Sequence, residues 1–409
     1  MTSAFHLFEV FGIEIELMLV DVDTLHVSPC CDRVLQAQAG EPACEVDNGV
    51  IGWSNELAAH VIELKTSGPV PSIDDAVATA FADDLRLVDR LARSCGARVL
   101  PTAMHPSMDP ARESVLWPHD GQDIYATYDR VFGCSGHGWT NLQSCHINLP
   151  FADADEFGRL HAAIRAVLPL LPALAASSPF VEGRFDGTMD RRLGVYASNQ
   201  KRVPSVIGDI IPEPVFTPEA YAREILQPIY DDIAPLDPHG ELQFEWLNSR
   251  GAIARFDRNA IEIRVLDSQE TPWADLAQAR LVASLVEALA QERWVDAQQL
   301  RALPTSDLRR VFDRTVEHAD AAIIDDPGLL LALGRDQTQL RADALWQELY
   351  SALPQRDDRL DAVLRRKLEL GSLSRRILAA TGESPHRRRL REVYADIADC
   401  GLQDRLFER

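Results

Sequence analysis

The chain has 409 residues, of which 46% are hydrophobic and 25% are charged, and its formal net charge is −22. This length and composition are typical of a soluble globular protein with one large domain and an appendage, or with two domains. The negative charge argues against a general nucleic-acid or anionic-membrane binder, because such partners need a basic surface. A small anionic ligand held by a few arginines or by a metal ion is still compatible with it.

The first residues, MTSAFHLFEVFG, have neither a basic segment nor a cleavage-site pattern, so we expect no secretory signal. No uninterrupted apolar run reaches the roughly 18 residues of a membrane span. The seven cysteines are scattered, and none forms a C-x-x-C pair. These features predict a cytoplasmic protein with reduced thiols, no zinc site and no membrane partner.

Alternation and breaker residues predict the elements of the first half of the chain. We expect strands at 11–21, at 60–67, in the segment ARVL and in the segment SCHINLPF, which Pro150 ends. Ser72 is expected to cap a helix over about 73–94. A second helix over 155–176 must kink or split at its two internal prolines, Pro169 and Pro172.

The second half begins with a long insert rich in Gly, Pro and Arg, from Ser177 to Pro214. Loops of this length inside a compact domain are usually functional or disordered, and the aromatic and arginine content favours function. The segment ELQFEWLNSRGAIARFDRN is predicted to be a loop leading to a strand over Ala260–Asp267, and from Pro272 the pattern is helical. The order predicts an α+β domain over 1–300 and a helical C-terminal region over 301–409 packed on it.

Four of the predicted strands share one design, with one apolar face and one polar face. The polar faces carry, in chain order, Glu14 and Glu16, Glu63 and Lys65, His146 and Asn148, and Glu262 and Arg264. If these strands share a sheet, four carboxylates converge on one surface and raise each other's pKa. Cys145 neighbours the histidine, but alternation predicts it on the opposite, core face.

Divalent cations would relieve the repulsion between these carboxylates. An oxygen-rich ligand set with one imidazole and no thiolate favours Mg²⁺ or Mn²⁺ over zinc. Arg264 beside Glu262 would then face an anion that the metal also binds, such as a phosphate. Taken singly, each strand has a plainer explanation: a solvated face, a structural histidine at position 146, or an ion pair between residues 262 and 264. The chain lacks both the P-loop and the G-x-G-x-x-G motif, so a nucleotide would bind without them.

Six short motifs occur in the order seen in the glutamate–cysteine ligase family, which also contains related carboxylate–amine ligases. They are FGIEIELMLVD, VIELKTSGP, VLPTAMHP, CHINLPF, ASSPFVEG and AIEIRVLD. The resemblance covers about Phe11 to Pro272, and the C-terminal helices add little to it. It implies a glutamine-synthetase-like fold: a curved, mainly antiparallel sheet flanked by helices, whose concave face holds ATP and two or three Mg²⁺. Residues 1–300 would then be the catalytic domain.

The resemblance also implies roles for single residues. The implied metal ligands are Glu14, Glu16, Glu63, His146 and Glu262, and the implied catalytic groups are Glu63 and Arg264, the latter contacting the transferred phosphoryl group. Arg192, in the insert segment 183–204, is the first candidate for the α-carboxylate of an amino-acid substrate, and Arg202 is the second. Asn148 and Arg255 are further candidate substrate contacts.

Two features depart from the family pattern. Several carboxylate–amine ligases have H-x-H where this chain has His146-Ile147-Asn148, so only one imidazole is available. Arg250 and Arg255 are extra cations just before the catalytic strand, and they form either surface ion pairs or a changed acceptor or carboxylate pocket. Cysteine is therefore not assumed to be the amine.

The sequence favours ATP- and Mg²⁺-dependent formation of an amide bond from a glutamate-like carboxylate and an amine acceptor, through an acyl phosphate. Two alternatives stay open: a guanidino (phosphagen-type) kinase on a related fold, and a non-catalytic regulator that binds a nucleotide or metal. A homo-oligomer is possible. The basic stretch Arg387–Arg389 with Arg391 is interpreted as a helix face that balances nearby acids, with a phosphate or partner site as the alternative.

Overall fold

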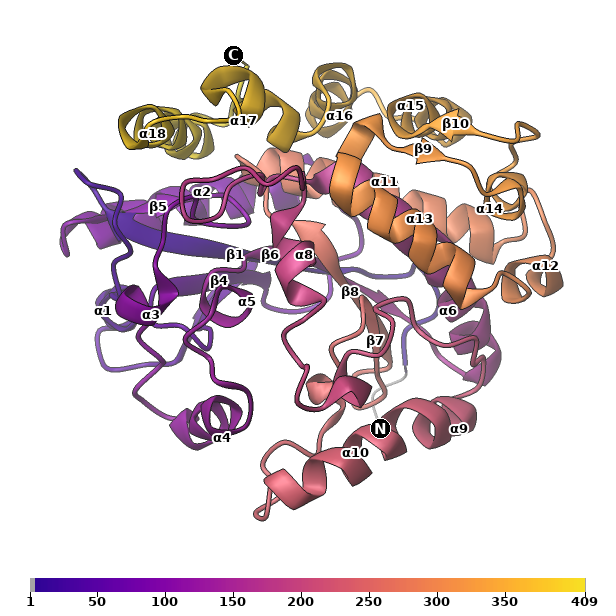
Figure 1. The fold of residues 1–409 in the computed structure, drawn as a ribbon, viewed down its shortest axis with the longest axis horizontal. Helices are drawn as coiled ribbons and strands as arrows, with labels where there is room; N and C mark the ends of the chain where they lie inside the picture. Colours follow the sequence, from indigo (N-terminus) through magenta and orange to yellow (C-terminus); the bar gives the residue numbers. More distant parts are fainter. Residues whose placement is uncertain (1–3, 409) are drawn as a thin grey trace.

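The computed structural model, which describes residues 4–408, is built around one mainly antiparallel sheet (Figure 1). The strand order is β2-β3-β4-β1-β6-β8-β7, and β5 pairs with the far end of β1. The strands of this sheet are β1 (Gly12–Asp21), β2 (Glu45–Asn48), β3 (Ile51–Asn55), β4 (Val61–Thr66), β5 (Ala97–Leu100), β6 (Ser144–Pro150), β7 (Ala252–Arg255) and β8 (Ala260–Asp267). The long strand β1 therefore lies at the centre and contacts three others.

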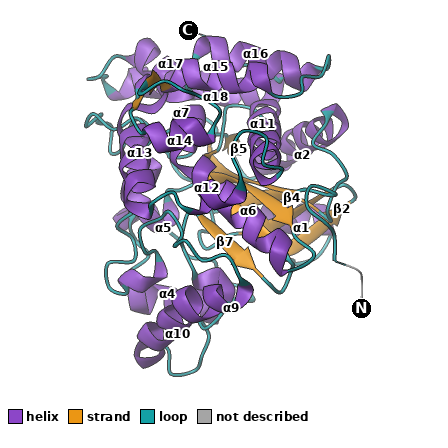
Figure 2. Cartoon of the chain, turned by 90° about the vertical axis from the view of Figure 1, so that its right-hand side faces the viewer, coloured by secondary structure: helices purple, strands orange, loops and turns teal. Residues whose placement is uncertain are grey.

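One face of the sheet is apolar and covered by helices. Ile13, Ile15, Leu17 and Leu19 of β1 point to this face and are fully buried, as a period of two requires. Helices α2 (Asp75–Arg93), α6 (Ala154–Val167) and α11 (Pro272–Ala290) pack beside the sheet on this side (Figure 2). This packing leaves the opposite face of the central strands free for polar side chains.

The opposite face of β1 changes character along its length. It is polar at Glu14 and Glu16, but it is apolar at Met18 and Val20, which pack in a second cluster with Tyr394 and other residues of the last two helices. Helices α17 (Leu373–Thr381) and α18 (Arg387–Gln403) thus cover only the far half of this face. The polar half stays accessible and becomes the candidate site.

Two groups of the remaining helices lie at opposite ends of the molecule, whereas others, such as α5 and α8, lie beside the sheet (Figure 1). Helices α15, α16, α17 and α18 gather on one side of the sheet, and α4, α9 and α10 lie at the opposite end (Figure 1). The helices whose bounds have not yet been given are α1 (Cys31–Ala39), α3 (Pro110–Glu113), α4 (Gln122–Phe132), α5 (His137–Thr140), α7 (Leu171–Ala175), α8 (Arg191–Tyr196), α9 (Pro218–Tyr221), α10 (Gln227–Ile233), α12 (Ala297–Arg301), α13 (Thr305–His318), α14 (Pro327–Ala332), α15 (Ala342–Ala352) and α16 (Arg359–Leu370). A two-residue strand pair, β9 (Ile323–Ile324) with β10 (Leu340–Arg341), interrupts the helical end.

The predicted α+β fold and the five predicted strands are confirmed, and the structure corrects one helix cap and adds three strands to the main sheet. Asp74, not Ser72, caps α2: its carboxylate accepts the N–H groups of Ala76 and Val77, while the Ser72 hydroxyl donates to Asp74. The segment before β8 was predicted to be a loop, but its last residues form β7, and the β2–β3 hairpin was not predicted. Short strands at a sheet edge carry little periodic signal, which explains both omissions.

The prediction that two prolines split the helix over 155–176 is confirmed. Helix α6 ends at Val167, a 3₁₀ turn spans Leu168–Leu170, and α7 follows. Among the described residues, Ala154–Ala175 is the one helical segment that is long and apolar enough to suit a membrane span. Its most apolar 18-residue window has a mean hydropathy of 1.2, and 94% of that window is buried inside the protein. Its apolar character is therefore accounted for by the protein core.

Candidate active site

The strand register brings the predicted polar residues onto one surface. Glu14 of β1 lies opposite Lys65 of β4 on one side and His146 of β6 on the other, and Glu16 lies opposite Glu63. Directly paired residues on adjacent strands project from the same face of a sheet. These five side chains line one cavity of about 490 Å³.

A potential cation site is formed by three of the residues that line this cavity. One ligand atom from each of Glu14, Glu63 and His146 falls within 4.8 Å of the others. The Nδ1 atom of His146 is 3.0 Å from a carboxylate oxygen of Glu14. Glu16 lies beside this cluster, where it accepts the backbone N–H of Ser144 at 2.6 Å and the Ser144 hydroxyl at 2.8 Å. Two carboxylates and one imidazole fit a hard divalent cation that completes its shell with ligand oxygens or water.

The ionisation of these groups reflects their crowding. Burial, and next the neighbouring Glu14, raise the pKa of Glu63 to about 7. Burial alone would lower the pKa of His146, but its hydrogen bond to Glu14 and the charge of Glu16 outweigh this and raise the pKa to about 9. The protein alone therefore keeps a proton among these ligands, and a cation would displace it.

Strand β8 adds a carboxylate held by two guanidinium groups. Glu262 is only 3% exposed, the Nε of Arg264 donates to its Oε1 at 3.1 Å, and Nη1 of Arg255 lies 3.5 Å from its Oε2. Burial would raise the pKa of Glu262, but the charges of Arg264 and His146 outweigh it and lower the pKa to about 2. Glu262 lies outside the three-residue cluster, 3.9 Å from the His146 Nδ1 atom. Its closest contacts orient Arg264, which lines the same cavity.

Arg192 lines the cavity from α8, in the loop-rich insert. Its guanidinium is buried and pairs with Asp267, and its Nη1 atom donates to the Arg264 carbonyl at 3.4 Å. Its Nη2 atom is buried and has no hydrogen-bond partner among the described residues. A buried, unpaired N–H group is costly, so an anionic ligand group at this point would be stabilised.

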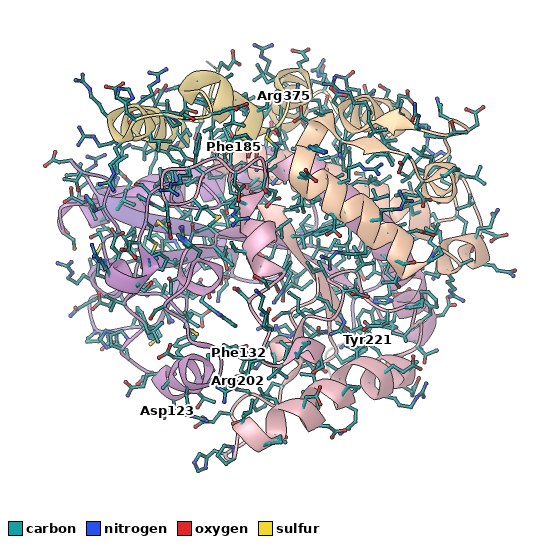
Figure 3. All side chains as sticks on the ribbon, in the orientation of Figure 1. Asp123, Phe132, Phe185, Arg202, Tyr221 and Arg375 are labelled. Atoms are coloured by element: carbon teal, nitrogen blue, oxygen red, sulfur yellow. The ribbon has the colours of Figure 1, made fainter. Side chains whose placement is uncertain are left out.

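Three other predicted residues have different placements. Arg202 lies beside Phe132, where its guanidinium donates to the carbonyls of Arg130 and Val131 at the end of α4, and it does not line the cavity (Figure 3). The side-chain amide of Asn148 donates to Glu14 at 3.0 Å and so positions a carboxylate rather than facing the cavity. Arg255 does line the cavity.

Sequence reasoning missed one acid and an aromatic wall. Glu56, between β3 and β4, lines the cavity, and burial followed by the charge of Glu63 raises its pKa well above the usual range. Tyr128, Trp139 and Trp246 form the wall, with ring centroids 5.4 Å apart for the first two and 5.9 Å apart for Tyr128 and Trp246. These residues come from α4, α5 and a turn before β7, and no local pattern joins segments so far apart in sequence.

The chain is similar to ligases in both sequence and fold. Residues 10–396 match the family model described as glutamate–cysteine ligase family 2. The chain is 33% identical over 321 residues to an uncharacterized protein of Archaeoglobus fulgidus, which covers 76% of this chain and 85% of the relative. It is 30% identical over 288 residues to a Nocardioides protein provisionally named glutamate–cysteine ligase 2-1, covering 70% of this chain and 69% of the relative.

Solved structures share the fold at low identity. One is the glutamate–cysteine ligase of Francisella tularensis in complex with AMP, with a TM-score of 0.58 and 12% identity, covering 97% of this chain and 88% of that chain. Another is a bifunctional glutathione synthetase of Pasteurella multocida, with a TM-score of 0.59 and 14% identity, covering 97% of this chain and 53% of that chain. The family match continues past Pro272 into the C-terminal helices, so the expectation that those helices add little to the resemblance is wrong.

Proposed function

The chain belongs to glutamate–cysteine ligase family 2 and is therefore an ATP-dependent carbon–nitrogen ligase, and from this premise we propose that it joins a glutamate-like carboxylate to an amine through an acyl phosphate. The observation that carries the proposal is that Glu14, Glu63 and His146 line the same cavity as Arg264 and Arg192. Such a site suits phosphoryl transfer, where positioning and charge neutralisation do most of the catalytic work.

Each group has a proposed role. Glu14, Glu63 and His146 would hold Mg²⁺ or Mn²⁺, with Glu16 and Glu262 beside them, and when bound this ion would neutralise the charge on the ATP phosphate oxygens. Arg264 would contact the oxygens of the transferred phosphoryl group, because its pairing with Glu262 holds the guanidinium in place at the cavity. The unpaired Nη2 of Arg192 would donate to a substrate carboxylate.

The reaction would proceed in two displacements. An oxygen of the substrate carboxylate attacks the γ-phosphorus of ATP, the bond to the β–γ bridging oxygen breaks, and ADP leaves. The amine nitrogen then attacks the acyl carbon, the carbon–oxygen bond to phosphate breaks, and the amine proton is released to solvent. The products are an amide, ADP and inorganic phosphate.

A hydroxylamine trap tests this proposal. The protein is incubated with ATP, Mg²⁺, glutamate and hydroxylamine, and the hydroxamate and ADP are measured in parallel, with controls that omit ATP or the metal. A ligase forms hydroxamate in step with ADP. ADP without hydroxamate would indicate a kinase, and the absence of both would indicate a non-catalytic regulator. Replacing hydroxylamine by single amines in the same assay then identifies the acceptor.

A further inference from the structure

A second cavity, of about 540 Å³, lies apart from the candidate active site. It is lined by the beginning of α18, the turn after β1 near His26, and the segment after β5 from His105 through α3. None of its lining residues lines the first cavity. Whatever binds in it would therefore not touch the proposed catalytic groups.

This cavity is locally basic in a protein whose net charge is −22. Its charged lining residues are Arg112, Arg387, Arg388 and Arg391 against Asp109 and Glu113. Glu113 is already engaged, because it accepts the N–H of Asp109 at 2.7 Å and lies 3.3 Å from the His26 ring. Asp109 lies 3.4 Å from the Arg112 guanidinium. The excess positive charge comes from α18.

Two of the α18 arginines have no acidic partner among residues 4–408. Arg388 pairs with Glu392 at 2.9 Å, and Arg389 lies 3.7 Å from the same carboxylate. Arg387 and Arg391 form no ion pair within the part of the chain that the structure describes. The interpretation of this stretch as a face that balances nearby acids thus holds for only half of it. Unpaired guanidinium groups at a cavity are available to an anion.

The backbone of α18 adds to the positive field. The 17-residue helix begins at Arg387, its N-cap His386 makes no side-chain capping bond, and its first turn contains no acidic residue. An uncapped helix N-terminus offers free N–H groups and a partial positive charge to an anion. Because Arg387 and Arg388 both line the cavity, this end of the helix lies at its wall.

Tyr394 gives an independent sign of a missing ligand group. Tyr394 lies on the same face of α18 as Arg387 and Arg391, lines the same cavity and is only 1% exposed. Its hydroxyl has no hydrogen-bond partner among the described residues. A buried hydroxyl without a partner is costly, whereas a ligand oxygen in reach would satisfy it.

We propose that this cavity is a second, non-catalytic binding site for a small molecule that carries a phosphate or pyrophosphate group. The unpaired guanidinium groups of Arg387 and Arg391, the N-terminus of α18 and the buried Tyr394 hydroxyl are the donors from which such a group would accept hydrogen bonds. The proposal does not depend on the ligase reaction, since it uses none of the residues of the first cavity.

Calorimetric titration with pyrophosphate, in chelator and without Mg²⁺, tests the proposal. Without the metal, the carboxylates of the first cavity repel anions, so binding there is suppressed. We expect the wild-type protein to bind one pyrophosphate per chain, and the double variant R387Q/R391Q to bind it at least about tenfold more weakly. Tyr394→Phe removes only the unpaired hydroxyl and should weaken binding a few-fold while the protein stays folded.

The matched control is R33Q/R90Q, which makes the same charge change at two exposed arginines of α1 and α2. It should bind pyrophosphate like the wild type. The proposal is overturned if the wild type does not bind, if R387Q/R391Q binds as tightly as the wild type, or if the control loses as much affinity. Loss of binding in Arg264→Gln with retention in R387Q/R391Q would also overturn it, by placing the anion in the first cavity.

Discussion

Arg264 is the residue at which the strand pattern and the proposed chemistry meet. Its guanidinium is held by Glu262 and lines the cavity. Lys in its place would keep the charge but not the planar fork that contacts two oxygens at once. We expect Arg264→Lys to bind ATP and Mg²⁺ nearly normally by calorimetry and to form hydroxamate about a hundredfold more slowly or worse, because the lost contact strengthens in the transition state.

Arg250→Lys is a suitable control for that variant. Arg250 is also buried beside a carboxylate, with Nε and Nη2 each 2.7 Å from an oxygen of Glu213, but it does not line the cavity. The folded Arg250→Lys variant should form hydroxamate at the wild-type rate. If Arg264→Lys instead stays within a few-fold of wild type, Arg264 is a structural ion-pair partner and the phosphoryl-transfer role fails.

Glu63 and Glu262 should respond oppositely to neutralisation. The folded-state pKa of Glu63 is raised to about 7, so at pH 8 its ionisation opposes folding, and Glu63→Gln should raise the melting temperature of the metal-free protein. The pKa of Glu262 is lowered to about 2, so its ionisation favours folding, and Glu262→Gln should cost about 3 kcal/mol because it removes the buried carboxylate that pairs with Arg264. Thermal unfolding in chelator measures both, and a shift of the same sign in both variants would contradict the assignment. Both variants should lose turnover.

Metal binding should be linked to pH through His146. Its pKa is raised to about 9, so the ring is protonated at pH 8 and must lose its proton to bind a cation. We expect the Mg²⁺ affinity to rise by up to about tenfold per pH unit until pH 9, with release of about one proton at pH 8. Calorimetry in two buffers of different ionisation enthalpy measures this release. Equal proton release in His146→Gln would show that the proton comes from another group.

At the scale of the element, strand alternation decides which neighbours of the catalytic groups take part in chemistry. Cys145 directly precedes His146 on β6, but it is fully buried in the core on the opposite face, and burial raises the pKa of its thiol well above the usual range. All seven cysteines are free. The prediction that Cys145 points to the core is confirmed.

Cys145→Ala should therefore retain turnover. The substitution removes one buried sulfur, so we expect a loss of about 1 kcal/mol in the free energy of unfolding from the small cavity. Hydroxamate formation by the folded enzyme and chemical denaturation separate the two effects. Lost turnover at unchanged stability would indicate a nucleophilic thiol and a different mechanism.

At the scale of the whole molecule, the C-terminal helices are tied to the sheet by buried charge. Arg376 of α17 pairs with Glu270, three residues after β8, and neither side chain is more than 4% exposed. Lys367 of α16 donates to Gln269 beside them. The continuous family match over residues 10–396 agrees with this integration. The boundary predicted at residue 300 stays a prediction.

Breaking this pair should destabilise the whole protein. Glu270→Gln leaves the Arg376 guanidinium buried without a carboxylate, so we expect a loss of about 3 kcal/mol in the free energy of unfolding. The control is Glu408→Gln, which breaks the exposed pair with Arg366 at 3.0 Å and should change little. Thermal unfolding compares them, and equal shifts would show that the buried pair does not fasten the helices.

The sequence by itself determined five strands of the main sheet, β1, β4, β5, β6 and β8, and the side chains they carry. Side chains alternate between the two faces of a strand, so the sequence shows which residues share a face. Glu14, Glu63, His146 and Glu262 could therefore be assigned to polar faces before any fold was known. The bounds of β8 and the split at Pro169 and Pro172 also follow from local rules, since proline and alternation act over a few residues.

The tertiary structure alone decided which of these residues meet. Strand order and register place Glu14 between Lys65 and His146, and local periodicity carries no information about either. The same holds for Glu56, the aromatic wall and the arginines of α18, which come together from distant segments, and for Arg202, which the chain path turns away from the cavity. The physical reason is that pairing between strands is set by burying the whole apolar face at once, a property of the complete chain.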